Sequence, residues 1–200
     1  MGVSLLKGMA DRETFEDAVA HELHHVGVQH WRTRDPTRQR LARERSGRAV
    51  AVLHVENLLS EGTANYYCTP RYVFGEPSTE PPVDPYQRRL ARLRKEEKQL
   101  LAPAEAVLAG CLEPGAEYAA SLEAFKAMAL DTEEFMLPAA HYLGARMVQT
   151  MERVYPRDDV LECVRDLAAF LPLYSTAAST TGGFVFGAQV VEEFARLLKS

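Results

Sequence analysis

The chain has 200 residues, of which 46% are hydrophobic and 26% are charged, and its formal net charge is −5. This length and composition favour one folded domain over residues 1–200 and argue against disorder. The negative charge excludes a basic surface for nucleic acid, and no apolar run approaches the roughly 20 residues of a membrane span.

The three cysteines, Cys68, Cys111 and Cys163, are widely separated, odd in number and not in a C-x-x-C pair. They are therefore neither a zinc knuckle nor a disulfide framework. Residues 1–10 lack a secretory core with a cleavage site. Reduced thiols without such a signal favour a cytoplasmic location.

After a short lead-in over residues 1–13, residues 14–28 are predicted to form an amphipathic helix, because apolar side chains recur at steps of three and four. This helix contains the H-E-x-x-H pattern His21-Glu22-Leu23-His24-His25, with one extra histidine. Positions four apart lie about 40° apart around a helix axis. His21 and His25 therefore project from one face, close enough to hold one ion, whereas His24 points away from that face.

Two neutral imidazoles on one face suit Zn2+, which prefers nitrogen and sulfur ligands in tetrahedral geometry. Glu22 stands beside the pair and is predicted to take a proton from a metal-bound water as the general base. A histidine-rich helix with ordinary surface and core histidines would show the same five residues. A third ligand is needed to separate these two interpretations.

Residues 49–67 are predicted to form a second helix, and Glu61 on it can supply that third ligand. A His2Glu set leaves the fourth position of zinc to water. Gly62, the next residue, costs about 1 kcal/mol relative to alanine in a helix, which favours a close approach of another backbone there. Asn65, one turn after Glu61, can either hydrogen-bond the outer ring nitrogen of a ligand histidine or face water.

The remaining sequence predicts further helices joined by loops. The arginine-rich residues 32–46 form either a solvated helix face or a patch for a partner. The other predicted segments are a proline-rich loop over 68–84, a charged helix from Asp84-Pro85 to about Leu101 that Pro103 interrupts, and helices over about 116–130, 138–155, 158–170 and 188–198. The fold class is therefore mainly α, a compact multi-helix domain with little or no β-sheet.

His21-Glu22-x-x-His25 followed by Glu61-Gly-x-Ala resembles the gluzincin zinc metallopeptidases. More narrowly, it is similar to helical families of Zn-dependent proteases with an HExHH helix and a later EGxA helix. The resemblance is specific over residues 14–67. It implies a zincin-like domain in which the two helices pack together, with His21, His25 and Glu61 as Zn2+ ligands and Glu22 as the general base.

The sequence departs from the gluzincin pattern in two places. Asn65 occupies a position four after the glutamate ligand where an acid often stands. Gluzincins also have a β-sheet before the metal helix, and only about thirteen residues precede it here, too few for several strands. The chain is then a compact or truncated version, or its substrate is not an extended peptide.

The resemblance extends weakly to His141-Tyr-Leu-Gly144, which is similar to a Y-x-x-G helix of those families, with histidine at the tyrosine position. An oxyanion needs a donor besides the metal, and His141 and Tyr142 are the candidates. They are adjacent on a helix and about 100° apart, so at most one of them points at the metal.

These observations predict a zinc-dependent hydrolase, most simply a metallopeptidase acting on a peptide or protein, with no nucleic-acid or membrane partner. The alternative is a non-catalytic helical binding or scaffold protein with a structural or vestigial zinc site. Glu22-x-x-His25 also matches the motif of di-metal carboxylate bundles. That fold needs a second Glu-x-x-His, which the sequence lacks.

Overall fold

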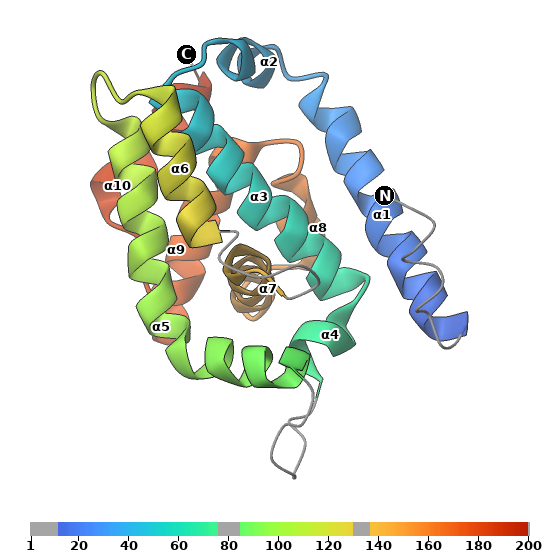
Figure 1. Ribbon diagram of the computed structural model, residues 1–200. Helices are drawn as coiled ribbons and strands as arrows, with labels where there is room; N and C mark the ends of the chain where they lie inside the picture. Colours follow the sequence, from blue (N-terminus) through green and yellow to red (C-terminus); the bar gives the residue numbers. More distant parts are fainter. Residues whose placement is uncertain (1–11, 76–84, 130–136, 200) are drawn as a thin grey trace.

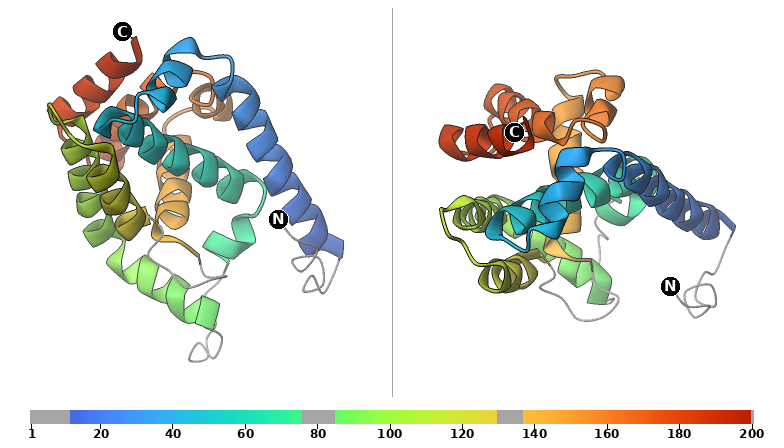
Figure 2. Two further views of the ribbon diagram at one scale, coloured as in Figure 1. Left: turned by 45° about the horizontal axis from the view of Figure 1, so that its top comes forward. Right: turned by 90° about the horizontal axis from the view of Figure 1, so that it is seen from above.

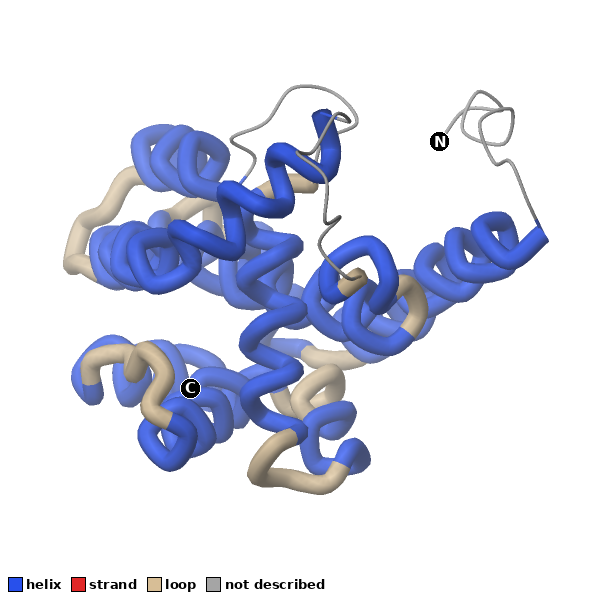
Figure 3. The backbone as a smooth tube through the Cα atoms, turned by 90° about the horizontal axis from the view of Figure 1, so that it is seen from below, coloured by secondary structure: helices blue, strands red, loops and turns tan. Residues whose placement is uncertain are grey.

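The computed structural model describes residues 12–75, 85–129 and 137–199, which form helices and loops with no strand (Figure 1, Figure 3). The fold is mainly α, as predicted. The helices in chain order are α1 (Arg12–Arg32), α2 (Pro36–Arg43), α3 (Gly47–Tyr67), α4 (Pro70–Phe74), α5 (Pro85–Leu112), α6 (Tyr118–Ala129), α7 (Ala139–Glu152), α8 (Arg157–Glu162), the 3-10 turn η2 (Leu167–Ala169), α9 (Phe170–Thr181) and α10 (Ala188–Lys199).

Helix α7 lies in the middle of the molecule, with α3, α5, α6 and α9 around it (Figure 1). Its sequence explains this place, because apolar and small residues occur on all its sides rather than on one stripe. Its buried residues are Ala139, Ala140, Tyr142, Leu143, Gly144, Ala145, Met147, Val148 and Met151. The helix that carries His141 is thus the centre of the hydrophobic core.

Helices α3 and α7 make the most extensive helix–helix contact among the described residues. They cross where Gly62 faces Gly144. A Cβ atom on Gly62 would lie 2.5 Å from the carbonyl carbon of Gly144, and one on Gly144 would collide with the carbonyl oxygen of Leu58. Gly62 thus allows the close backbone approach expected from its sequence position, and the partner helix is α7.

Helix α1 lies beside α3 at the edge of the molecule, and its N-terminal half extends away from the other helices (Figure 1, Figure 2). Its apolar stripe does not pack against the core. Phe15, Val19, Leu23 and Val26 are 40–66% exposed. The helix turns its histidines towards α3 instead, so hydrogen bonds and charge position it more than apolar burial does.

The proline-rich segment contains more helix than predicted. Pro70, whose fixed φ suits a first helical position, begins the short helix α4, while residues 76–84 lie outside the described ranges. The expected interruption at Pro103 was also wrong, because α5 continues through it to Leu112. A proline inside a helix removes one backbone hydrogen bond and bends the axis, and Figure 1 shows the axis of α5 turning between its two halves.

The helix predicted over about residues 158–170 is present only in its first part. Helix α8 ends at Glu162, and Asp166 begins the turn η2 by accepting a hydrogen bond from the backbone N–H of Ala168. Aspartate favours such local side-chain caps over a helix interior. Pro172 lies in the first turn of α9, where a missing N–H is tolerated.

The arginine-rich segment is only partly a solvated face. Arg38 is buried and donates hydrogen bonds to the carbonyl oxygens of Val164 and Arg165, both at 3.0 Å. It also forms ion pairs with Asp35 at 2.9 Å and with Glu56 at 3.5 Å. Arg38 therefore joins α2 and α3 to the segment after α8. None of the described helices has the length and apolar character needed to cross a bilayer.

Candidate metal centre

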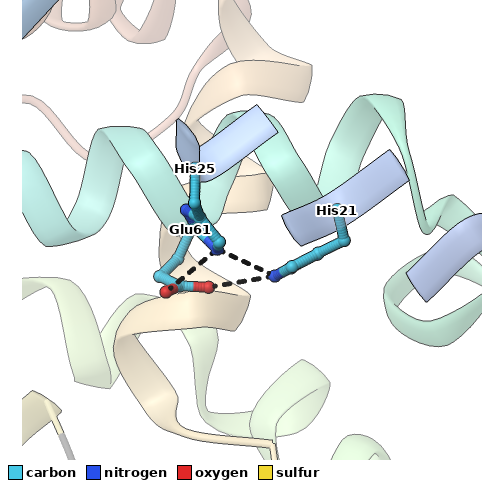
Figure 4. A group of neighbouring side chains, drawn as sticks. All are labelled: His21, His25 and Glu61. Carbon is cyan, nitrogen blue, oxygen red and sulfur yellow. Dashed lines mark hydrogen bonds and ion pairs between the residues drawn. The ribbon is translucent and has the colours of Figure 1, made fainter. Parts of the chain in front are cut away.

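Helix α1 supplies His21 and His25 to one cluster, and α3 supplies Glu61 (Figure 4). The two Nε2 atoms lie 3.0 Å apart. Nε2 of His21 is 3.5 Å from Oε2 of Glu61, and Nε2 of His25 is 3.5 Å from Oε1. Glu61 lies 36 positions after His25 in the chain, and yet the donor atoms of all three residues point at a common position.

The donor set fits a zinc ion. The ligand atoms of a tetrahedral Zn2+ bonded at about 2.0–2.1 Å lie about 3.3 Å apart, close to the 3.0–3.5 Å separations here. Two imidazoles and a carboxylate leave the fourth position of such an ion open. His21, His25 and Glu61 can therefore hold a metal, and Zn2+ suits their chemistry.

The outer ring nitrogen of each histidine faces a hydroxyl group of α3 or of the residues that follow it. Nδ1 of His25 lies 2.9 Å from Oγ of Ser60, and Nδ1 of His21 lies 3.5 Å from Oγ1 of Thr69. A hydroxyl oxygen that accepts the Nδ1 proton leaves Nε2 with a free lone pair for a metal. Ser60 and Thr69 were not predicted from the sequence, because no spacing rule relates them to α1.

Asn65 has no direct contact with a histidine ring, in contrast to one of the two sequence interpretations. Its side-chain amide donates to the backbone oxygen of Glu61 at 2.7 Å, and its Oδ1 accepts from the hydroxyl of Thr69 at 3.4 Å. It is also buried, so it does not face water either. Asn65 orients Thr69, and Thr69 in turn contacts His21.

The cluster favours an ionised Glu61 before any metal binds. Burial opposes ionisation, but the hydrogen bonds with His21 and His25 outweigh it and hold the pKa of Glu61 well below its usual range. The same contact with Glu61 raises the pKa of His25 against the effect of burial, and the charge of Glu22 adds to it. An anionic carboxylate thus faces two imidazoles, and a divalent cation can replace the protons that they share.

Glu22 is exposed on α1, next to His21. Its charge reaches His25, whose pKa it raises. The carboxylate is therefore near the metal ligands and open to solvent, where a substrate can approach. Its role as a general base stays a prediction.

His141 and Tyr142 point in different directions from α7. Nδ1 of His141 lies 3.3 Å from Oε2 of Glu61, and burial lowers the pKa of His141, which favours the neutral ring. The hydroxyl of Tyr142 instead donates to Glu97 at 2.9 Å, and burial followed by this carboxylate raises its pKa. The structure brings His141 to the metal centre and places Tyr142 in a separate cluster with Glu97 and Arg146.

His24 docks α1 on α3 without joining the metal ligands. Its Nε2 lies 2.7 Å from Oγ1 of Thr63, and that hydroxyl donates to the carbonyl oxygen of Leu59 at 2.7 Å. The Thr63 oxygen must therefore accept from His24. Burial, together with the nearby His25, lowers the pKa of His24 to about 4, which keeps the ring neutral near pH 7.

A comparison with protein-family models matches residues 3–182 to one family, described as "Putative zinc dependent peptidase (DUF5700)". Searches of curated proteins and of solved structures give no significant match. The family match covers most of the chain and includes α1, α3 and α7, which carry the residues above. The chain therefore belongs to the DUF5700 family.

Proposed function

We propose that this protein is a zinc-dependent hydrolase, specifically a metallopeptidase that acts on a peptide or protein. The observation that carries the proposal is the convergence of His21, His25 and Glu61 from two helices, with Glu22 exposed beside them. The family description supports the same activity. A His2Glu set with an open fourth position is typical of catalytic rather than structural zinc sites.

When bound, zinc acts as a Lewis acid and lowers the pKa of water to about 7. The chain's own residues supply the rest of the chemistry. Glu22 accepts the proton of the attacking water and later delivers it to the leaving amine, as a general base and then a general acid. His141 is half-buried and neutral beside Glu61, and once the Glu61 carboxylate is bound to the metal, the single N–H of His141 donates to the oxygen of the attacked carbonyl group. Tyr142 has no part in this scheme, because its hydroxyl is bound to Glu97.

Glu22→Gln tests the proposal, since it removes the base and leaves the ligands in place. Peptide hydrolysis is expected to fall by about 10²–10⁴-fold, while the zinc content of the purified protein stays the same. Glu123→Gln is the matched control, because Glu123 is an exposed helical glutamate on α6. Unchanged turnover in Glu22→Gln would contradict the assigned role of Glu22.

A second candidate is a non-catalytic helical binding protein that holds zinc for structure. One observation favours it: the described residues contain no strand whose edge could align an extended peptide. The same experiment separates the two functions. A zinc-loaded wild type that is as inert as Glu22→Gln on a broad panel of peptides and esters would favour the binding protein.

We also propose a cytoplasmic location for the protein. Cys68, Cys111 and Cys163 are free thiols, and burial raises the pKa of each. Such thiols are weak nucleophiles and suit a reducing compartment.

A further inference from the structure

The exposed side of α1 carries a row of large apolar side chains, which we name the apolar stripe: Phe15, Val19, Leu23 and Val26. They are 43%, 40%, 63% and 66% exposed, respectively. Isolated apolar residues on a surface need no explanation, but four in a row on one helix face form a contiguous patch. These four also account for most of the large apolar residues that the described chain exposes.

The apolar stripe borders the metal centre on the side of Glu22. Successive residues of a helix are rotated by about 100°. On this basis Glu22 falls between the direction of His21 and His25 and the direction of Leu23 and Val26. The predicted base therefore stands at the edge of the stripe, and a molecule lying along the stripe meets Glu22 before it meets the zinc ligands.

The opposite flank of α1 is less suited to a substrate. A hollow of about 410 Å³ lies there between α1 and α8, lined in part by His24 and Trp31. The guanidinium of Arg165 covers the Trp31 ring at 4.3 Å, and His24 is engaged by Thr63. At about 100° per residue, His24 and Trp31 project from the side of α1 opposite to Glu22.

The size of the apolar stripe suits a peptide better than a second copy of the chain. From the exposed fractions, its area is on the order of 300–400 Å², in the range of functional patches on monomers. A stable protein–protein interface needs about 800 Å² from each partner. A few side chains of a peptide can cover the stripe, whereas a dimer would need much more surface around it.

The lack of a strand among the described residues also favours a peptide that is bound through its side chains. Where no sheet edge pairs with a substrate backbone, recognition depends on side chains. The four residues of the stripe are exposed large apolar residues on the same helix as Glu22.

We infer that the apolar stripe of α1 is the substrate-binding surface of the metal centre, and that it selects peptide segments with neighbouring large apolar side chains. This inference rests on the proposed function and adds a substrate class to it. Segments of this kind are accessible in unfolded or unstructured chains and are buried in folded ones. The enzyme would therefore favour unstructured apolar segments over folded proteins.

The test measures binding as well as hydrolysis. Two fluorescein-labelled decapeptides are compared, one with leucine and phenylalanine at its central positions and one with alanine there. Fluorescence anisotropy with zinc-loaded Glu22→Gln protein, which holds the peptide without cleaving it, gives the two dissociation constants. The apolar peptide is expected to bind about tenfold more tightly, a factor typical of a few apolar contacts.

The paired substitution Leu23→Asn and Val26→Asn, added to Glu22→Gln, is expected to remove that preference. In the otherwise wild-type protein the same pair should raise KM for the apolar peptide about tenfold, with kcat and zinc content unchanged. Val185→Asn is the matched control, because Val185 is also exposed, at 46%, and lies far from α1 in the chain. Val185→Asn should change neither the preference for the apolar peptide nor KM.

Equal binding of the two peptides, or a preference that survives the paired substitution, would overturn the inference. So would a wild-type dimer that the pair converts to monomers in light scattering, because a second copy would then occupy the stripe. A wild type that cleaves both peptides equally well sinks the inference and leaves the proposed function standing. An inert, zinc-loaded wild type that still binds the apolar peptide through the stripe sinks the proposed hydrolase instead.

Discussion

Gly144→Ala tests how the core positions the helix that carries His141. The added methyl group would collide with the carbonyl oxygen of Leu58 and lie 2.9 Å from the Cα atom of Gly62. Carbon atoms in ordinary contact are about 3.5–4.0 Å apart, so α3 and α7 would have to separate by on the order of 1 Å. The obstacle is backbone, which cannot rotate away as a flexible side chain can.

The expected magnitude follows from two opposing effects. Overpacking a core costs about 1–3 kcal/mol, and a backbone obstacle places this site at the upper end. Alanine is favoured over glycine in a helix by about 1 kcal/mol, which offsets part of the cost. The free energy of unfolding should therefore fall by about 2 kcal/mol, which lowers Tm by about 4–8 °C in a protein of this size.

Chemical denaturation of the metal-free protein measures this change. Gly110→Ala is the control, because a Cβ atom at Gly110 in α5 would have nothing within 4 Å. That variant should gain about 0.5–1 kcal/mol, so the two substitutions are expected to have opposite signs. Zinc affinity should change little in either variant, because His21, His25 and Glu61 lie on α1 and α3. A Gly144→Ala protein as stable as wild type would refute the close crossing.

Two further predictions concern a histidine buried in the core and a half-buried serine beside the metal centre. Burial lowers the pKa of His54 to about 4, below its unfolded value near 6.5, so the neutral ring favours the folded state and this stability is lost as pH falls from about 6.5 to 4. In urea denaturation, the free energy of unfolding of the wild type should fall by about 2–3 kcal/mol more than that of His54→Leu between pH 7 and pH 4. An equal fall in both proteins would contradict this. Ser60→Ala, which deletes the hydroxyl 2.9 Å from Nδ1 of His25, should weaken zinc binding about 10–100-fold in a competition titration. Ser179→Ala, at an exposed position of α9, should not, and a similar affinity in both variants would remove Ser60 from the metal centre.

The candidate metal cluster could be predicted because helical spacing and a short motif indicate its members. His21 and His25 share a face through helical periodicity alone, and Glu61 was recognised by its motif with Gly62. Ser60 and Thr69 could not be found in this way, since their contacts with the histidines exist only after α1 packs on α3. Asn65 was predicted on the correct side of α3, but Thr69 lies between it and His21.

Local rules also failed where the neighbouring structure outweighed them. Pro103 was expected to interrupt a helix that continues through it. The spacing of apolar residues in α1 predicted a helix, and the structure has one at Arg12–Arg32. Periodicity, however, does not state whether a partner covers the apolar side, and in the structure Leu23 and Val26 face solvent.

Residue type and spacing along the helices were enough to predict the helical class and the candidate metal cluster of His21, His25 and Glu61, and the role of Glu22 beside this cluster stays a prediction. Which residue of α7 accompanies Glu61 depends instead on how α3 and α7 pack. His141 faces it and Tyr142 does not, because the contact between Gly62 and Gly144 fixes how α7 is rotated against α3. That rotation depends on two surfaces fitting together, and no spacing within one helix encodes it.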